Sequence, residues 1–367
     1  MRKHYLDNIR WITVVLVVIY HVFYMYNAEG VAGVVGKITD LDKQYYDVFQ
    51  YIVFPWFMMI LFIVSGISSK LYLDGHTTKE FVRSRTRKLL VPSTLGVVFF
   101  FFIQGWYNTA FSNVFQKAGD IPFIAKVFII LASGIGVMWY IQILWFFSMV
   151  LLLIRKIEKD RLWNVCSKIN AIGIVLLSAA VFGAAQIGNT PVICVYRFGL
   201  YGFSFLLGYY VFSHDEVIDI LKRYCIPLLA IAIVLGTIFS IKYFGLNYAD
   251  APVNRTPLFV FFAWSTCLAI LGLAAKYADF ATPFTKWMSA RSFGLYLFHY
   301  LGISIIAYHM GMTHRYPALI VYTLTLISAF VTAYVLYFII SHIPFYRWVV
   351  LGISQKEINR KKEAANV

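Results

Sequence analysis

Charged residues are scarce in this sequence of 367 residues. Only 13% of them are Asp, Glu, Lys or Arg, whereas an ordinary soluble domain contains about 25%. Hydrophobic residues account for 60% of the chain and aromatic residues for 19%, and the mean hydropathy is +0.72. The shortage of charge excludes an ordinary soluble protein, and the excess of apolar residues predicts a polytopic membrane protein.

Cysteine is also rare, and acidic residues are missing from the hydrophobic runs. The four cysteines (Cys166, Cys194, Cys225 and Cys267) lie far apart without metal-ligand spacing, so no metal site is predicted. All 17 acidic residues fall outside the hydrophobic runs or at their edges. Proton- and ion-coupled transporters commonly use carboxylates within the membrane. The distribution of acidic residues therefore disfavours that class of transporter.

Several hydrophobic runs come close to the length of about 20 residues that crosses a bilayer as an α-helix. They cover residues 9–28, 50–72, 89–107, 136–156, 170–186, 193–213, 225–244, 257–276, 291–311 and 316–341. A shorter apolar segment, 121–133, contains Lys126, which favours an interfacial or re-entrant helix. Short polar connectors join the runs. We therefore expect an all-α bundle of about ten transmembrane helices in a single domain, 1–345, followed by a short basic tail, 346–367.

Basic residues are distributed unevenly between the two sides of this predicted bundle. With the N-terminus in the cytoplasm, most of the 32 Lys and Arg residues fall in cytoplasmic segments, as the positive-inside rule requires. Both termini are therefore expected to be cytoplasmic, and this topology explains the net charge of +15 without a nucleic-acid partner. The N-terminus lacks the cleavage pattern of a signal peptide, so the first run is expected to remain in the membrane.

The first hydrophobic run carries an unusual pair of ionisable residues, Arg10 and His21. Eleven positions make about three helical turns, so both side chains project from one stripe, about 16 Å apart along the axis. Asp7 precedes Arg10 by three residues and falls close to the same stripe. An ionisable side chain within the bilayer is costly and marks a functional site. The alternative for His21 is a structural histidine bonded to a neighbouring helix.

Two further ionisable residues are candidates, His299 in the middle of its predicted span and Arg197 in the outer part of its span. Lys242 and His309 also lie within spans, but near outer ends, where they could reach water. Histidine has an ordinary pKa near 6.5 and suits acid–base catalysis near neutral pH, so the sequence favours an enzyme with a histidine base. His299 could instead hydrogen-bond Tyr296, three residues before it. Arg197 could contact a substrate or simply anchor the chain at the outer interface.

A basic run precedes the third hydrophobic run and ends at Pro92. It contains Arg83, Arg85, Arg87 and Lys88. Guanidinium groups match phosphate in a bidentate manner, so this run could bind a phosphorylated ligand. Positive-inside topology or attraction to anionic membrane lipid would explain it equally well.

Several short motifs occur in order along nearly the whole chain. They are Tyr5-Leu-Asp-Asn-Ile-Arg10, the pair Arg10 and His21, Phe62-Ile-Val-Ser65-Gly66, the basic run ending at Pro92, Trp139-Tyr140, and Ser292-Phe-Gly-Leu-Tyr-Leu-Phe-His299. Together they resemble acyltransferase family 3, the integral-membrane acyltransferases that modify extracytoplasmic carbohydrates. The hallmark of that family is an Arg and a His separated by ten residues in the first span. The opening motif is most similar to the branch that adds succinyl groups to periplasmic glucans.

The sequence departs from this family in two respects. The basic run of the family often contains Arg-x-x-Arg, whereas the nearest match here is Arg85-x-x-Lys88. No extracytoplasmic esterase-like domain follows the last predicted span either. The individual phosphate ligands are therefore left open, and a second, hydrolytic step would require another protein.

The resemblance implies a function and its partners. It implies an acyltransferase of the bacterial cytoplasmic membrane that uses acyl-CoA as co-substrate, holds no permanently bound cofactor and modifies a carbohydrate hydroxyl outside the cell. The acyl group would be acetyl or succinyl. The alternative function is a carrier or flippase for an anionic glycan or lipid, with Arg10 and Arg197 contacting the substrate. A membrane sensor or scaffold is a third option, which no sensory domain supports.

The resemblance also implies roles for the candidate residues. His21 would act as general base or take the acyl group itself, and Arg10, oriented by Asp7, would line the donor's entrance. Arg83, Arg85, Arg87 and Lys88 would hold the phosphates of acyl-CoA. Donors to the thioester oxygen would come from Ser65, Tyr296 or His299. Trp139 and Tyr140 would pack against sugar rings or anchor the chain at the lipid interface.

Overall fold

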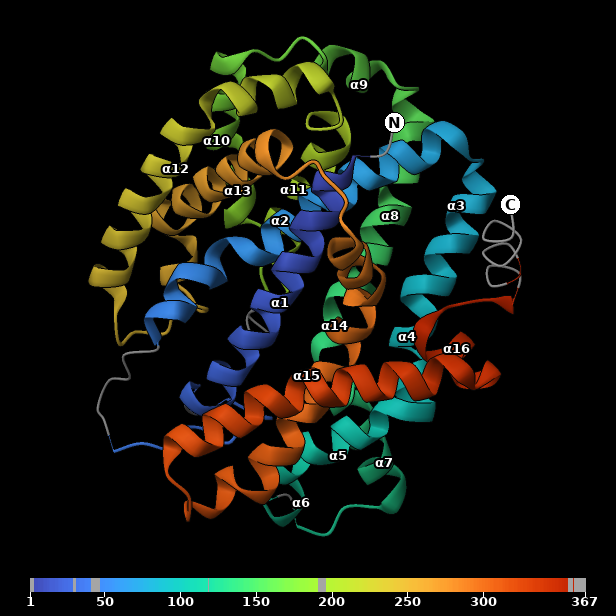
Figure 1. The fold of residues 1–367 in the computed structure, drawn as a ribbon, viewed down its shortest axis with the longest axis vertical. Helices are drawn as coiled ribbons and strands as arrows, with labels where there is room; N and C mark the ends of the chain where they lie inside the picture. Colours follow the sequence, from blue (N-terminus) through green and yellow to red (C-terminus); the bar gives the residue numbers. More distant parts are fainter. Residues whose placement is uncertain are drawn as a thin grey trace. The chain divides into compact units, whose positions relative to one another are not determined.

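The structure is a computed structural model that describes residues 3–28, 31–40, 47–117, 119–190, 196–355 and 359. Its regular structure is helical (Figure 1). The single β contact among these residues is an isolated bridge between Asn189 and Arg197. The prediction of an all-α fold is therefore confirmed for the described part of the chain. Cys194 and much of the predicted basic tail lie outside the described residues.

Sixteen α-helices follow one another along the described chain. They are α1 His4–Asn27, α2 Asp47–Gly75, α3 Thr78–Arg85, α4 Val91–Ser93, α5 Phe102–Phe111, α6 Val114–Lys117, α7 Phe123–Ser133, α8 Trp139–Glu158, α9 Arg161–Cys166, α10 Ala171–Gln186, α11 Phe198–Tyr210, α12 Asp215–Tyr243, α13 Pro257–Tyr277, α14 Pro283–His309, α15 Ala318–His342 and α16 Pro344–Leu351. Short π-helical turns at Thr86–Leu90 and Val97–Phe101 lie between α3, α4 and α5.

Eight helical segments of the described chain are long and apolar enough to cross a membrane. Helix α10 has 16 residues, close to the predicted run 170–186, whereas α11 has 13, fewer than the predicted run 193–213. At 1.5 Å per residue they extend about 24 and 20 Å, less than the hydrocarbon thickness of about 30 Å. The segment predicted to be a short helix is α7, with 11 residues. The protein is thus an integral membrane protein, while a count of ten spans and the orientation stay predictions.

The chain divides into two compact units. Unit 1 comprises Met1–Leu16, Lys43–Thr78 and Phe147–Ala290, and unit 2 comprises Val17–Asp42, Lys79–Phe146 and Arg291–Val367. Helix α1 contributes its first half to unit 1 and its second half to unit 2. The expectation of a single membrane domain over 1–345 stays a prediction.

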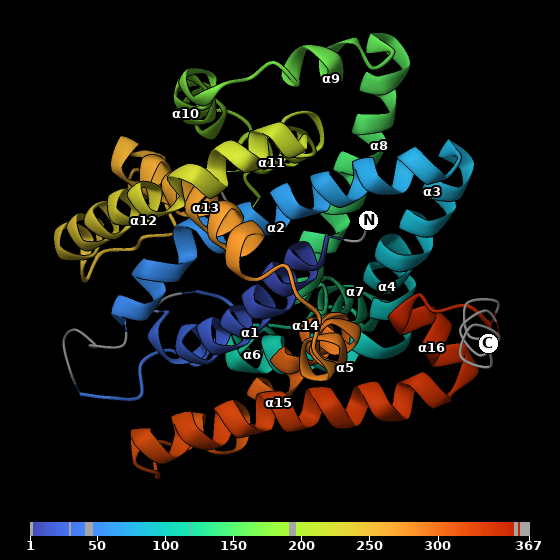
Figure 2. The same ribbon diagram turned by 45° about the horizontal axis from the view of Figure 1, so that its top comes forward.

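Unit 1 is packed around close helix–helix contacts. Helices α12 and α13 lie side by side (Figure 2), and α2 packs against α11 through two glycines. A Cβ atom at Gly66 would lie 2.0 Å from the carbonyl oxygen of Phe205, and one at Gly208 would lie 2.1 Å from that of Ile63. The two backbones therefore touch, and the glycine of the Phe62-Ile-Val-Ser65-Gly66 motif is required by this packing.

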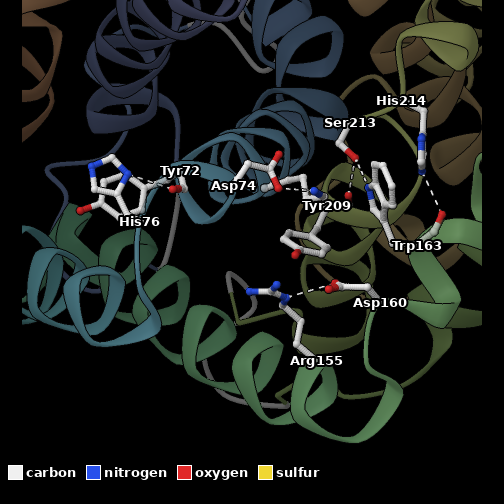
Figure 3. Close-up of polar contacts among 10 residues, drawn as sticks. Tyr72, Asp74, His76, Arg155, Asp160, Trp163, Tyr209, Ser213 and His214 are labelled. Carbon is white, nitrogen blue, oxygen red and sulfur yellow. Dashed lines mark hydrogen bonds and ion pairs between the residues drawn. The ribbon is translucent and has the colours of Figure 1, made fainter.

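Unit 1 also contains a polar cluster around Trp163, on α9 (Figure 3). The indole Nε1 donates to Ser213 Oγ at 2.9 Å, and Lys70 Nζ lies 4.2 Å from the centre of the indole. The His214 ring stacks on the indole at 4.1 Å, and its Nε2 hydrogen-bonds the Trp163 carbonyl at 3.0 Å. Burial lowers the pKa of His214 below its ordinary value of 6.5. These contacts hold the end of α2 to α9 and to the α11–α12 connection.

Unit 2 contains a helical segment that is interrupted around Pro92. Proline has no N–H and disrupts the hydrogen-bond ladder of a helix interior, and the ladder here changes to π-helical turns before and after α4. The backbone leaves helical geometry at Thr94, with φ −124° and ψ −77°. A side chain of α8 compensates for the break, since Gln142 Nε2 donates to the Ser93 carbonyl at 2.8 Å.

Candidate functional site

The central feature of unit 2 is a hydrogen bond between two histidines. Nδ1 of His21 on α1 lies 3.0 Å from Nε2 of His299 on α14, and the two rings are tilted by 32°. Nδ1 of His299 lies 3.0 Å from the carbonyl oxygen of Leu295. His299 is fully buried, whereas His21 is only half-buried. The structure therefore brings together two residues that the sequence singled out separately.

The hydrogen bonds fix the positions of the protons on this pair. A carbonyl oxygen can only accept, so Nδ1 of His299 must be the protonated nitrogen that donates to Leu295. In a neutral ring Nε2 of His299 is then an acceptor, so Nδ1 of His21 must donate to it. A neutral His21 consequently carries its lone pair on Nε2. That is the tautomer that a general base or nucleophile needs.

Aromatic side chains surround the histidine pair. The Tyr300 ring meets His21 edge-on at 5.3 Å, and the rings of Tyr20 and Tyr24 lie at 5.4 and 6.3 Å. The Tyr296 hydroxyl donates to the Val137 carbonyl. The His299 ring is hydrogen-bonded to the Leu295 carbonyl and to His21.

Arg10 and Asp7 form an ion pair within unit 1. Arg10 Nη1 lies 3.1 Å from Asp7 Oδ1, and Arg10 Nη2 donates to Ser68 Oγ at 2.9 Å. The helical spacing predicted the contact between Arg10 and Asp7 but not the one with Ser68. Ser65 is buried one turn before Ser68 on α2, and this i, i+3 relation is the signal that could have indicated Ser68.

The start of α1 is anchored by a residue that sequence reasoning missed. Asn8 is buried, and its Nδ2 donates to the carbonyl oxygens of Ala278 and Phe280 at 2.7 and 3.0 Å. Asn8 lies inside the motif that ends at Arg10. The asparagine of this motif therefore holds the helix that carries Arg10 against the α13–α14 connection.

The basic run lies in unit 2 and packs against the C-terminal segment. Arg83 and Lys88 are exposed, whereas Arg85 lies over the Phe81 ring at 5.0 Å. Arg87 Nη1 donates to Ser354 Oγ at 3.0 Å. Gly352 ends α16 with φ +62°, and a Cβ atom there would lie 2.4 Å from the Arg87 carbonyl oxygen. The contact with residues 352–354 was not predicted, because the tail was distinguished only by its charge.

Helix α8 contacts both the segment of the basic run and the helix that bears His299. Near the run, Trp145 Nε1 donates to Thr86 Oγ1 at 3.1 Å. Farther along the same helix, the Tyr140 ring meets the Tyr296 ring edge-on at 5.9 Å, one turn before His299 on α14. Trp139 lies beside Tyr140, with ring centres 6.4 Å apart. The part of α8 that lies in unit 2 thus contacts both Thr86, within the basic run, and Tyr296.

Arg197 is buried in unit 1 and precedes α11. It is 1% exposed, its Nη2 donates to the Asn254 carbonyl at 2.7 Å, and its guanidinium lies 5.0 Å from the Phe259 ring centre. A substrate would reach this guanidinium only if these neighbours moved. These neighbours, Asn254 and Phe259, are not among the candidate residues.

Grouped metal ligands are not found in the part of the chain that the structure describes. Among those residues, no three His, Cys, Asp or Glu side chains lie close enough together to hold a metal ion. The pair of histidines is engaged in the hydrogen bond between its two rings instead.

Comparison with known proteins identifies the family. A family model described as an acyltransferase domain matches residues 3–338, which include every candidate residue named above. Comparisons with curated proteins and with solved structures returned no match. The matched region covers nearly the whole chain, and it contains seven of the eight long apolar segments completely and most of the eighth, Ala318–His342. The chain therefore belongs to acyltransferase family 3.

Proposed function

We propose that the protein transfers an acetyl or succinyl group from cytoplasmic acyl-CoA to a hydroxyl of an extracytoplasmic carbohydrate, in the cytoplasmic membrane of a bacterium. Membership of the family supports acyl transfer, and the donor and acceptor are our inference. The observation that carries the proposal is the hydrogen bond between His21 and His299, which leaves a lone pair on Nε2 of the more accessible ring.

The proposed reaction uses His21 as its base. Nε2 of His21 takes the proton of the acceptor hydroxyl while the hydroxyl oxygen attacks the thioester carbon. The carbon–sulfur bond then breaks, and the leaving thiolate takes the proton from His21. His299 accepts a hydrogen bond from Nδ1 throughout and stabilises the transient imidazolium. The same tautomer would also allow Nε2 to take the acyl group first and pass it to the hydroxyl.

The cationic residues are proposed to bind the donor. Arg83, Arg85, Arg87 and Lys88 would contact the phosphates of acyl-CoA, and Arg87 is already oriented by Ser354. Arg10 would line the entrance of the donor. The contacts of Arg10 with Asp7 and Ser68 hold its guanidinium in one orientation.

The remaining candidate residues keep proposed roles in substrate binding. Tyr140 and Tyr296 would position the substrates, since their rings contact each other one turn before His299 on α14. Trp139 is proposed to pack against the sugar ring. Ser65 and Arg197 lie in unit 1. Ser65 is kept as a candidate because of its sequence motif, and Arg197 because it is an ionisable residue within a predicted span.

The experiment that tests the proposal follows the acyl group. Purified protein in lipid nanodiscs is given acetyl-CoA or succinyl-CoA with a labelled acyl group, together with oligosaccharides released from the envelope of cells that lack the protein. We expect the label to appear on the oligosaccharides by mass spectrometry, with one free CoA thiol released per group transferred. A carrier or flippase would move the oligosaccharide without consuming the thioester. That result would overturn the proposal.

A further inference from the structure

A polar network of unit 2 contains a buried hydrogen-bond acceptor with no donor. Gln104 on α5 is 5% exposed, and its Nε2 donates to Asn108 Oδ1 at 2.9 Å and to Ser304 Oγ at 2.8 Å. Its Oε1 atom is buried and has no hydrogen-bond partner among the residues that the structure describes. A buried acceptor left unsatisfied costs about 1–3 kcal/mol, so this atom is suited to receive a donor from a ligand.

The network itself fixes the orientation of the Gln104 amide. Asn108 Nδ2 lies 2.8 Å from the Ser133 carbonyl oxygen, which can only accept, so this atom is the NH₂ group of Asn108. Asn108 Oδ1 must then face Gln104, and only an N–H of Gln104 can point toward it. Both hydrogens of Nε2 are thereby used. The unpartnered atom of Gln104 is an oxygen, and exchange of its two amide atoms would place two oxygens against each other.

The same network reaches the ring that contacts His21. The backbone carbonyl of Asn108 accepts from Ser112 Oγ at 3.3 Å, and Ser112 Oγ accepts from the Gly33 N–H at 2.8 Å. The Gly33 carbonyl accepts from the Tyr300 hydroxyl at 3.4 Å, and Tyr300 meets His21 edge-on. Ser304 lies one turn beyond Tyr300 on α14. A chain of hydrogen bonds through Asn108, Ser112 and Gly33 therefore links Gln104 to Tyr300, whose ring contacts His21.

Aromatic rings lie one turn beyond the Gln104–Ser304 contact. Tyr107 follows Gln104 by three residues on α5, and Tyr308 follows Ser304 by four on α14, so each shares a face with its partner. Their rings are 5.6 Å apart, and the exposed Trp106 lies 5.3 Å from Tyr308. The buried acceptor Oε1 and the aromatic rings thus lie one helical turn apart. This combination suits a sugar, which offers both hydroxyl donors and apolar C–H faces.

We propose that Gln104 Oε1 accepts a hydrogen bond from a hydroxyl of the carbohydrate acceptor and is a binding residue of its subsite. This inference rests on the proposed function, because it takes the acceptor to be a carbohydrate. The competing donor would be an amide N–H of the pantetheine arm of acyl-CoA. Removal of the Gln104 amide distinguishes these ligands. Our proposal predicts weaker binding of the carbohydrate, and the competing donor predicts weaker binding of acyl-CoA.

Replacement of Gln104 by methionine tests the proposal, since methionine keeps the length of the side chain and removes its hydrogen-bonding groups. With envelope oligosaccharides from cells that lack the protein as acceptor, Gln104→Met should lower kcat/KM for the oligosaccharide by about tenfold or more. KM for acyl-CoA should stay unchanged. The matched control is Thr109→Val, which removes a buried hydroxyl of the same helix that donates to the Trp106 carbonyl and should leave both constants unchanged.

A binding measurement separates this proposal from the proposed chemistry. The oligosaccharides should bind His21→Ala protein without acyl-CoA about tenfold or more tightly than they bind His21→Ala, Gln104→Met protein. This readout does not require catalysis. Unchanged oligosaccharide affinity, a loss confined to acyl-CoA, or equal losses in Gln104→Met and Thr109→Val accompanied by a lower Tm would each overturn the proposal.

Discussion

Nδ1 of His21 donates a hydrogen bond to Nε2 of His299, although the two residues lie 278 positions apart in the sequence. The acceptor for His21 is thus a second imidazole rather than a carboxylate. A neutral acceptor stabilises protonated His21 less than a carboxylate would, so a proton taken from the hydroxyl is passed on readily to the leaving thiolate. The pair therefore suits a base that must release its proton within each catalytic cycle.

We expect His299 to support catalysis through its orientation of His21. His299→Ala removes the acceptor that orients the His21 ring and should lower kcat by about 10²-fold or more, with little change in KM for acyl-CoA. His299→Gln retains an oxygen that can accept from His21 and should recover part of the loss. The measurement is steady-state acyl transfer by the three proteins. Equal kcat for His299→Ala and the unaltered protein would contradict the assigned role.

The basic run is expected to act on the donor rather than on the acceptor. Replacement of Arg83, Arg85, Arg87 and Lys88 by glutamine should raise KM for acyl-CoA by about tenfold or more, because charge-assisted bonds to phosphate are lost. KM for the oligosaccharide should change little. Lys79→Gln, in the same helix α3, is the matched control. Similar changes in both KM values would indicate that the run serves only membrane topology or lipid binding.

Gly66 is expected to be essential for the packing of α2 on α11. A methyl group at this position would lie 2.0 Å from the Phe205 carbonyl oxygen, so Gly66→Ala should destabilise the protein by about 1–3 kcal/mol. Thermal unfolding in detergent measures the effect. Gly183→Ala in α10 is the control, because nothing lies within 4 Å of the added atom. An unchanged Tm for Gly66→Ala would show that the two backbones do not touch.

His214 should make stability depend on pH in a defined direction. Burial lowers its pKa below 6.5, and the charge of Lys70 adds to this, while the Trp163 carbonyl and Glu216 oppose it. The unfolded chain then takes up a proton more readily than the folded one. The contribution of neutral His214 is therefore present above about pH 6.5 and is lost as the pH falls below it.

The measurement for His214 is Tm in detergent between pH 7.5 and 5. The unaltered protein should lose more stability across this range than His214→Gln, which cannot titrate. Parallel curves for the two proteins would show that the imidazole does not contribute.

Local spacing predicted the parts of the site that lie on single helices. The contact of Asp7 with Arg10 follows from their i, i+3 spacing, and the placement of Arg10 and His21 on one helix follows from an uninterrupted apolar run. The all-α fold class could likewise be predicted from the sequence, because it follows from the period and length of the hydrophobic runs alone. These features depend on neighbours in the sequence.

Contacts between distant segments could not be predicted from spacing. The bond between His21 and His299 and the packing of Gly352 on Arg87 depend on which helices become neighbours. Hydropathy also overestimated the length of α11, since composition does not reveal that the helix begins only at Phe198. Ser68 and Asn8 were missed because each acts through a partner on another segment.

The central claim is that His21 is the base or nucleophile of acyl transfer. The most direct test compares His21→Ala with the unaltered protein in nanodiscs, with labelled acyl-CoA and envelope oligosaccharides from cells that lack the protein. We predict that His21→Ala retains the Tm and the acyl-CoA affinity of the unaltered protein but transfers the label at least about 10²-fold more slowly. Transfer by folded His21→Ala at the rate of the unaltered protein would contradict the account.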